Sequence, residues 1–220
     1  DAADYLNFLV EDEDTEIIVG MIESIRRPRE FMAAAEKAFK AKKPVIIMKL
    51  GKTELGKEQA KTHTGAVAVD DDVFSAMCRR YGVVRCHSVD EMVDFALAFG
   101  QKRLPSGNKL GIVTTSGGAV GLALDAVGTE GGELSKLNPE TIEKMETFVP
   151  DEVDVNNPMD AGSTLAQRVP EFCQLCEMFA ADENVDILAI QGRVPLSDDK
   201  IRTPENYVAL KASTDKPVFA

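Results

Sequence analysis

A regular alternation of short apolar runs with amphipathic stretches is the feature that most constrains the fold of this chain. Apolar runs typical of buried strands occupy residues 17–22, 45–50, 83–86, 109–114, 133–137, 185–191 and 217–219. Between them, apolar residues recur at helical spacing over residues 29–41, 71–81, 88–99, 118–127, 139–148, 170–181 and 204–212, after a first helical stretch at 1–10. Such alternation predicts an α/β fold of parallel sheets with helices on both faces.

A short segment at residues 101–108 interrupts the alternation. Pro105, Ser106 and Gly107 disfavour regular structure there, and a new strand–helix series begins after it. A length of 220 residues suits one large or two modest domains. We therefore expect one domain over 1–103 and a second over 104–220. The first opens in mid-helix with few strands, and the second ends on an uncovered strand, so we expect both to be incomplete parts of a longer polypeptide.

Charge and hydropathy exclude several classes of function. Lys plus Arg is 25 and Asp plus Glu is 37, so the formal net charge is 25 − 37 = −12. A nucleic-acid-binding surface needs a basic stripe, which such a balance argues against. No run approaches the roughly 18 apolar residues that a membrane span requires. There is no initiator Met and no signal peptide, so we expect a trimmed or mature chain start and a cytoplasmic protein.

The cysteines suggest packing more than chemistry. Cys173 and Cys176 have the spacing of a metal or redox pair, but no second such pair completes a four-ligand zinc site. Both cysteines share a helical face with Phe172 and Phe179, so we expect buried, reduced thiols and no metal.

One of the two histidines, His63, is the first candidate for chemistry. It follows the apolar run 45–50 within residues 51–69, which we expect to be a long loop. Open α/β sheets bind ligands beyond the carboxyl ends of their strands. An imidazole there could attack or carry a transferred group at neutral pH. A loop histidine that makes one hydrogen bond is the alternative, and position alone does not decide between them.

Glu23 is the second candidate. It stands at the carboxyl end of the run 17–22, and the next strand along the chain leads into the His63 segment. A carboxylate that accepts the imidazole N–H would orient the ring and strengthen it as a nucleophile. Spacing alone nevertheless favours a solvated surface glutamate followed by Arg26 and Arg27.

The third candidate is the turn between the strand at 109–114 and the following helix. It contains small and hydroxyl-bearing residues: Thr115, Ser116, Gly117, Gly118 and Ala119. Free amides and the helix dipole favour an anion at such a helix start. The run is neither a Walker motif nor a GxGxxG fingerprint, and two glycines at a strand-to-helix turn also occur for tight packing alone.

An ordered set of motifs resembles one enzyme family along nearly the whole chain. The matching stretches are residues 5–12, 21–23 with 29–31, 43–49 leading into Thr62-His63-Thr64-Gly65, 81–85, 109–118 and 157–160. Together they resemble the nucleoside-diphosphate-forming acyl-CoA synthetases, relatives of succinyl-CoA synthetase. The resemblance implies two flavodoxin-like domains, the first of which bears a phosphohistidine loop and is truncated at its start.

Site roles follow from this resemblance alone. His63 would carry a phosphoryl group between an acyl phosphate and ADP or GDP, and Glu23 would orient it. Phosphate would bind at Thr115, Ser116, Gly117, Gly118 and Ala119, and the loop would be supported by Thr62, Thr64, Gly65, Asn157 and Asp160. Two departures stand out. Thr62 replaces the usual serine, and an acidic run at residues 70–72 replaces a glycine after the loop, so its mobility is expected to differ.

The resemblance also implies what lies outside the chain. CoA, ATP or ADP and Mg²⁺ would be bound mainly by CoA-binding and ATP-grasp domains that these residues do not include. The expected partners are those domains, in the same protein or another subunit, and a small carboxylic acid or acyl-CoA, in an oligomer.

Two other functions remain open. The same domains occur as regulatory or scaffold modules, for instance fused to protein acetyltransferases; retention of His63 and Glu23 favours catalysis. A flavodoxin-like FMN-binding domain has little support, because 6% aromatic residues leave few rings to stack on a flavin.

Overall fold

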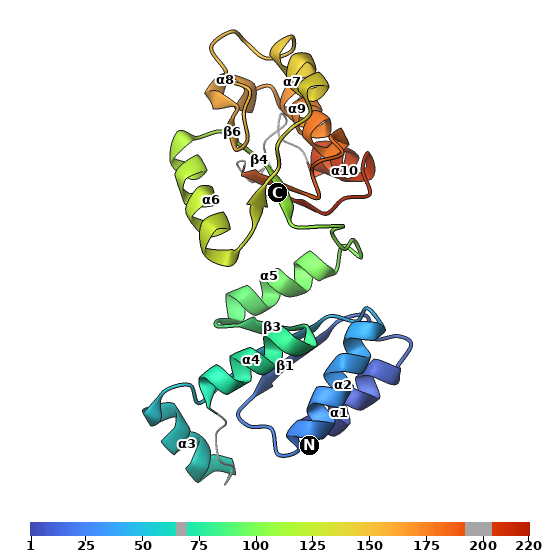
Figure 1. Ribbon diagram of the computed structural model, residues 1–220, viewed down its shortest axis with the longest axis vertical. Coiled ribbons are helices and arrows are strands. Elements are labelled where there is room, and N and C mark those ends of the chain that lie inside the picture. Colours follow the sequence, from blue (N-terminus) through green and yellow to red (C-terminus); the bar gives the residue numbers. More distant parts are fainter. Residues whose placement is uncertain (65–69, 192–203) are drawn as a thin grey trace. The chain divides into compact units, whose positions relative to one another are not determined.

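A computed structural model of the chain describes residues 1–64, 70–191 and 204–220 (Figure 1). The side chains of residues 59–61, 63, 64 and 204 also lie outside the described part. The chain divides into two compact units, Asp1–Lys102 and Arg103–Ala220, and each unit has its own parallel sheet. The α/β prediction is confirmed.

The first unit alternates strands and helices around three parallel strands in the order β1-β2-β3 (Figure 1). Its elements are α1 (Ala2–Glu11), β1 (Ile18–Ile22), α2 (Pro28–Lys40), β2 (Val45–Lys49), α3 (Glu54–Thr64), α4 (Asp71–Tyr81), β3 (Val83–Cys86) and α5 (Val89–Phe99). Strand β2 is buried along its whole length, as expected for a central strand covered on both faces.

Alternate residues of β2 face two separate cores. Val45 and Ile47 pack with α1, α2 and α4, whose contributions include Leu6, Phe31 and Phe74. Ile46 and Met48 pack on the opposite face against apolar residues of α5. The two-residue repeat of the strand therefore sends each side chain into one layer of helices, which holds the carboxyl end of the sheet in a fixed position.

The expected long loop at 51–69 is wrong in its first half, because α3 spans Glu54–Thr64. Thr53 caps this helix through a hydrogen bond from the Gly56 amide to its hydroxyl at 3.2 Å. Lys57 pairs with Glu54 at 2.7 Å on the same helical face. The Thr53 cap and the helix-forming residues of this segment therefore outweigh the unfavourable effect of Gly56 on a helix.

The second unit has five parallel strands and five helices within its described residues (Figure 1). The elements are β4 (Lys109–Thr114), α6 (Gly117–Glu130), β5 (Glu133–Leu134), α7 (Pro139–Glu146), β6 (Met159–Asp160), α8 (Gly162–Ala166), α9 (Val169–Ala181), β7 (Ile187–Gln191), α10 (Pro204–Ala212) and β8 (Val218–Phe219). Strand β4 is central: it pairs with β7 on one side, and with both β5 and β6 on the other.

The core of this unit lies between the sheet and helices α7 to α10. Buried residues of α9, including Phe172, Leu175 and Phe179, pack against Leu188 of β7. Helix α6 lies on the opposite side of the sheet from α9 and α10 (Figure 1). It has no buried residue although its sequence is largely apolar, and Leu122 and Leu124 are exposed.

The residue before α7 does not cap the helix through its side chain. Asn138 occupies the N-cap position, but its side chain makes no hydrogen bond to the helix. Its amide nitrogen donates instead to Asp182 at 3.2 Å, and its carbonyl oxygen accepts from Asn184 at 3.0 Å. The side chain is therefore used to join the start of α7 to the loop after α9.

All four cysteines are buried and free, and for Cys173 and Cys176 this burial was predicted from their helical spacing. Burial raises the pKa of the Cys78 and Cys173 thiols to about 11, so both are protonated at neutral pH. Cys173 and Cys176 pack on the inner face of α9 as apolar groups. Within the described residues, no helix is long and apolar enough to cross a membrane.

Candidate functional site

Glu23 and the start of the His63 segment lie at the same edge of the first sheet. Ile22 and Lys49, the last residues of β1 and β2, are register partners, and the Leu50 amide donates to the Ile22 carbonyl at 2.8 Å. Glu23 follows Ile22 directly and is half-buried. The sheet therefore fixes the glutamate beside the point where the chain leaves toward His63.

His63 itself is described only by its backbone. It lies at the carboxyl end of α3, while its side chain and that of Thr64, with the whole of Gly65, lie outside the described part of the chain. Thr62 is exposed on the same helix. The contact between Glu23 and His63 stays a prediction.

A buried ionic cluster at this edge was not found by sequence reasoning. Lys49, with 2% of its side chain exposed, lies 3.6 Å from an Asp71 oxygen, and Arg85 Nη2 donates to both Asp71 oxygens at 2.7 Å. Arg85 also donates to the Ser75 hydroxyl, and both cations lie near the Phe74 ring, at 5.9 Å for Lys49 and 5.5 Å for Arg85. The only signal in the sequence was a charged residue at the end of each of two apolar strands.

Charge and capping together fix the start of α4. Hydrogen bonding from Arg85, assisted by the charges of Arg85 and Lys49, lowers the pKa of Asp71 against the opposing effect of burial. The preceding Asp70 caps the helix, since its carboxylate accepts from the amides of Asp72 at 3.0 Å and Val73 at 3.2 Å. Part of the acidic run that departs from the family pattern therefore has a local structural reason.

His87, the second histidine, lies beyond the carboxyl end of β3. Its Nδ1 is 3.2 Å from Lys52 Nζ, and its backbone amide donates to the Glu91 carboxylate at 2.6 Å. The Ser88 hydroxyl accepts from the Glu91 amide and so caps α5. These contacts are exposed and serve the entry into α5.

In the second unit, the glycine-rich turn joins β4 to α6 as predicted. Thr114 is fully buried, and its hydroxyl both accepts from the Ser116 amide and donates to the Ser116 carbonyl at 2.9 Å. Ser116, Gly117 and Gly118 are exposed, and Ser116 makes no side-chain cap of α6. The first N–H groups of a helix have no intrahelical acceptor, so this turn has the features of an anion site.

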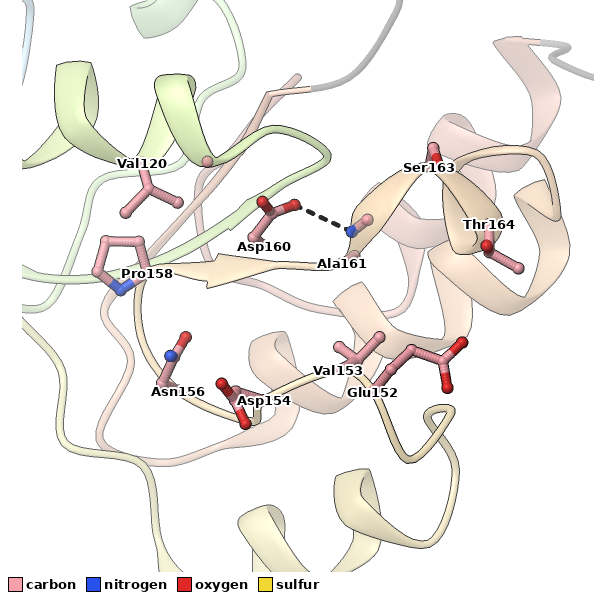
Figure 2. Close-up of a pocket in the computed structure, with 12 residues that line it drawn as sticks. Val120, Glu152, Val153, Asp154, Asn156, Pro158, Asp160, Ala161, Ser163 and Thr164 are labelled. Atoms are coloured by element: carbon pink, nitrogen blue, oxygen red, sulfur yellow. Dashed lines mark hydrogen bonds between the residues drawn. The ribbon is translucent and has the colours of Figure 1, made fainter.

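A cavity of about 530 Å³ adjoins this turn (Figure 2). Its lining comes from the turn, the loop before β6 and the start of α8: Gly117, Val120, Glu152, Val153, Asp154, Asn156, Pro158, Asp160, Ala161, Gly162, Ser163 and Thr164. The Asp160 carboxylate accepts from the Gly162 amide at 3.0 Å, and its other oxygen lies 3.4 Å from the position of a Cβ built on Gly117. An aspartate therefore stands directly beside the predicted phosphate turn.

Asn157 has a well-defined structural place. Its carbonyl oxygen accepts from the Ile112 amide at 2.9 Å, and its amide nitrogen donates to the carbonyls of Leu110 at 2.7 Å and Ser135 at 2.9 Å. Strands β5 and β6 pair with opposite ends of β4. In the gap between them, the Asn157 side chain makes the hydrogen bonds to β4 that a neighbouring strand would otherwise make. This substitution of a side chain for a strand also explains why β5 is shorter than predicted.

A metal cluster is not among the features of either edge. Within the described residues, no group of three or more His, Cys, Asp or Glu side chains could hold a metal ion. The three carboxylates around the cavity are spread along its wall (Figure 2).

Comparison with known proteins identifies the class to which this fold belongs. Residues 1–99 match the family described as succinyl-CoA ligase like flavodoxin domain. The chain is 38% identical over 213 residues to the ADP-forming acetate–CoA ligase I of Archaeoglobus fulgidus, with 96% of this chain and 30% of that protein aligned. It is 36% identical to subunit alpha of the ADP-forming acetate–CoA ligase II of Pyrococcus furiosus, with 100% and 48% aligned.

Solved structures agree with this class. The dinucleotide forming acetyl-coenzyme A synthetase 1 of Ca. Korarchaeum cryptofilum, in complex with phosphate and ADP, superposes with a TM-score of 0.83 at 26% identity. The superposition covers 99% of this chain and 47% of that one. Residues 1–99 of the first unit thus match the succinyl-CoA-ligase-like flavodoxin domains, and the whole chain is similar in sequence and fold to part of the ADP-forming acetate–CoA ligases. It spans less than half the length of these relatives.

Proposed function

We propose that this chain is the phosphohistidine-bearing part of an ADP-forming acyl-CoA synthetase. The observation that carries the proposal is the shared sheet edge: Glu23 and the departure of the His63 segment meet at adjacent strand ends. Relatives that align with nearly the whole chain are named ADP-forming acetate–CoA ligases, which supports the same chemistry.

His63 would act as a nucleophile and then as a leaving group. A neutral ring nitrogen attacks the phosphorus of an acyl phosphate, the P–O bond to the acyl group breaks, and a carboxylate leaves. A β-phosphate oxygen of ADP then attacks the phosphohistidine, the P–N bond breaks, and ATP leaves with the histidine neutral again. The acyl phosphate and free CoA arise from acyl-CoA and phosphate. Glu23 would accept the N–H of the ring and hold its orientation.

Phosphate would bind in the second unit at Thr115–Ala119. The exposed first turn of α6 offers amides and the positive end of a helix dipole. Asn157 would support this site by holding β4 and β6 together, while Asp160 beside Gly117 limits how closely an anion can approach from the cavity side. Thr62, Thr64 and Gly65 would support the histidine from its own segment.

The remaining parts of the reaction belong to residues outside this chain. CoA, ATP or ADP and Mg²⁺ would be bound mainly by CoA-binding and ATP-grasp domains, in the same polypeptide or in another subunit. Mg²⁺ would enter with the nucleotide. One relative is itself a subunit alpha, which supports assembly with another subunit. The intact protein would be a cytoplasmic enzyme that acts on a small carboxylic acid.

A regulatory or scaffold module is the competing function. It would use the same fold without phosphoryl transfer, for instance in a fusion with a protein acetyltransferase. The presence of both His63 and Glu23 in the sequence favours the enzyme.

The test uses the full-length protein with ATP labelled at the γ-phosphate and Mg²⁺. We expect protein-bound label that is lost in acid and kept in alkali, present in the parent and absent in His63→Asn. A matched control is His87→Asn, which should keep the label because His87 lies beyond a different strand. An intact, nucleotide-binding preparation without label would favour the scaffold function.

A further inference from the structure

The segment that carries His63 leaves and returns to the first unit at two residues in direct ionic contact. Lys49 is the last residue of β2, and Asp71 is the first residue of α4. Their side chains lie 3.6 Å apart, from Lys49 Nζ to Asp71 Oδ1. The ion pair therefore links the two ends of the segment between Lys49 and Asp71, which includes α3 and His63.

Neutralisation of Asp71 does not explain the burial of Lys49. Arg85 already contacts both oxygens of that carboxylate at 2.7 Å. Among the described contacts the cluster thus pairs two cations with one carboxylate, and Lys49 is 98% buried on its side chain. Buried ion pairs contribute little net stability, because desolvation offsets the attraction. A second buried cation at this place needs another reason.

Position supplies that reason. Lys49 reaches back to the Gly51 carbonyl at 3.4 Å and across to Asp71 at 3.6 Å, so one ammonium contacts both the exit and the return of the segment. Register places Lys49 opposite Ile22, the residue before Glu23. The residue that carries this ammonium is therefore also the register partner of the strand end that precedes Glu23.

We infer that Lys49 is a positioning residue for phosphoryl transfer, which acts through Asp71 to hold the His63 segment in register with Glu23. The inference rests on the proposed function of His63. Lys49 neither bonds the phosphoryl group nor moves a proton. Errors of about 1 Å in the position of a reacting group reduce rates by roughly 100-fold, so loss of this brace should slow the transfer while the fold remains.

The experiment compares Lys49→Met with the parent in the full-length protein. Met keeps the length of the side chain and leaves the Arg85–Asp71 contact intact, so the melting temperature should stay within a few degrees. We expect the rate of His63 labelling to fall roughly 10- to 100-fold. Formation of acyl phosphate and CoA from acyl-CoA and phosphate, which does not involve His63, should keep its rate. Lys40→Met, at an exposed lysine of α2, is the matched control and should change neither rate.

A double-mutant cycle distinguishes positioning from a general structural role. If Lys49 acts through Asp71, then Lys49→Met adds little to the labelling defect of Asp71→Asn. Labelling of Lys49→Met at the parental rate overturns the inference and leaves the proposed function standing. Equal slowing of both half-reactions, with a lowered melting temperature, also overturns it. Absence of label in the parent overturns the proposed function and this inference together.

Discussion

The two units end their central strands in opposite ways. In the first unit, β2 ends in a buried lysine paired with Asp71, which Arg85 also binds, and a long segment with its own helix follows. In the second, β4 ends in the neutral Thr114, and a tight turn enters α6 directly. The same kind of strand-to-helix connection can therefore serve two purposes. In the first unit it carries a side chain on a segment whose ends are held by an ion pair, and in the second it exposes backbone amides at a helix start.

The supporting groups differ in the same way. Ionic contacts join the strand ends of the first unit to α4, whereas the uncharged Asn157 joins β4 to β6 in the second. A predicted phosphate site gains from the neutral Asn157, because a carboxylate in place of that side chain would add to the repulsion that Asp160, beside Gly117, already exerts on an anion. A predicted phosphoryl carrier needs a segment whose two ends are held in place. The contacts of Lys49 and Arg85 with Asp71 hold these ends.

The largest effect is expected from a negative charge introduced into the turn at Thr115–Ala119, which tests whether its backbone amides bind phosphate. Gly118→Asp has space, since a Cβ at Gly118 would lie 3.7 Å from the Ser116 hydroxyl, and an acidic residue suits a helix start. If the backbone binds phosphate, like-charge repulsion should weaken it at least roughly 100-fold. Calorimetric titration of inorganic phosphate into the full-length protein measures this, and Gly118→Asn is the neutral control. Unchanged affinity in Gly118→Asp would refute the turn as the phosphate site.

A smaller effect is expected from the neutral support. Asn157→Ala removes three hydrogen bonds at 2.7 to 2.9 Å and leaves the Ile112 amide without its acceptor. The free energy of unfolding should fall by about 2–3 kcal/mol, as measured by denaturant unfolding of the full-length protein. Asn156→Ala, at the exposed neighbour, serves as the control. A loss below about 0.5 kcal/mol in Asn157→Ala would mean that β4 and β6 are held by other contacts.

The smallest expected effect concerns the ionic support. Arg85→Met should destabilise the protein by about 1–2 kcal/mol at neutral pH, less than for a fully buried pair because Asp71 is 35% exposed. Arg85 lowers the folded pKa of Asp71, so the contribution is complete above the unfolded pKa of about 3.9 and disappears as pH falls through the folded pKa. The difference between parent and variant should therefore shrink below that pH. A difference that grows in acid would contradict the assignment.

The sequence was most informative where local patterns determine structure. Apolar runs located all the longer strands, and α4 begins at residue 71, where the helical spacing predicts it. Helix α3 was missed because His63 and two glycines drew attention to a loop, although Thr53 and Glu54 carried the signals of a helix start. The Lys49–Asp71–Arg85 cluster and the bridge made by Asn157 join residues far apart in sequence, so no local pattern could reveal them.

The candidate site residues also divide into those that a local sequence pattern reveals and those that depend on contacts between distant segments. Glu23 and the turn at Thr115–Ala119 were found because each directly follows an apolar strand. The position of Asp160 beside Gly117 depends on the pairing of β6 with β4. A strand of two residues leaves too short a pattern in the sequence for this pairing to be predicted.

The most direct test of the account is discharge of the isolated phosphoprotein. Full-length protein labelled from γ-labelled ATP would be freed of nucleotide and mixed rapidly with ADP, and the label followed into ATP. If His63 is the phosphoryl carrier, the label should move to ATP in a single step at least as fast as steady-state turnover. Label that stays on the protein, or leaves more slowly than turnover, would contradict the claim that His63 lies on the reaction path.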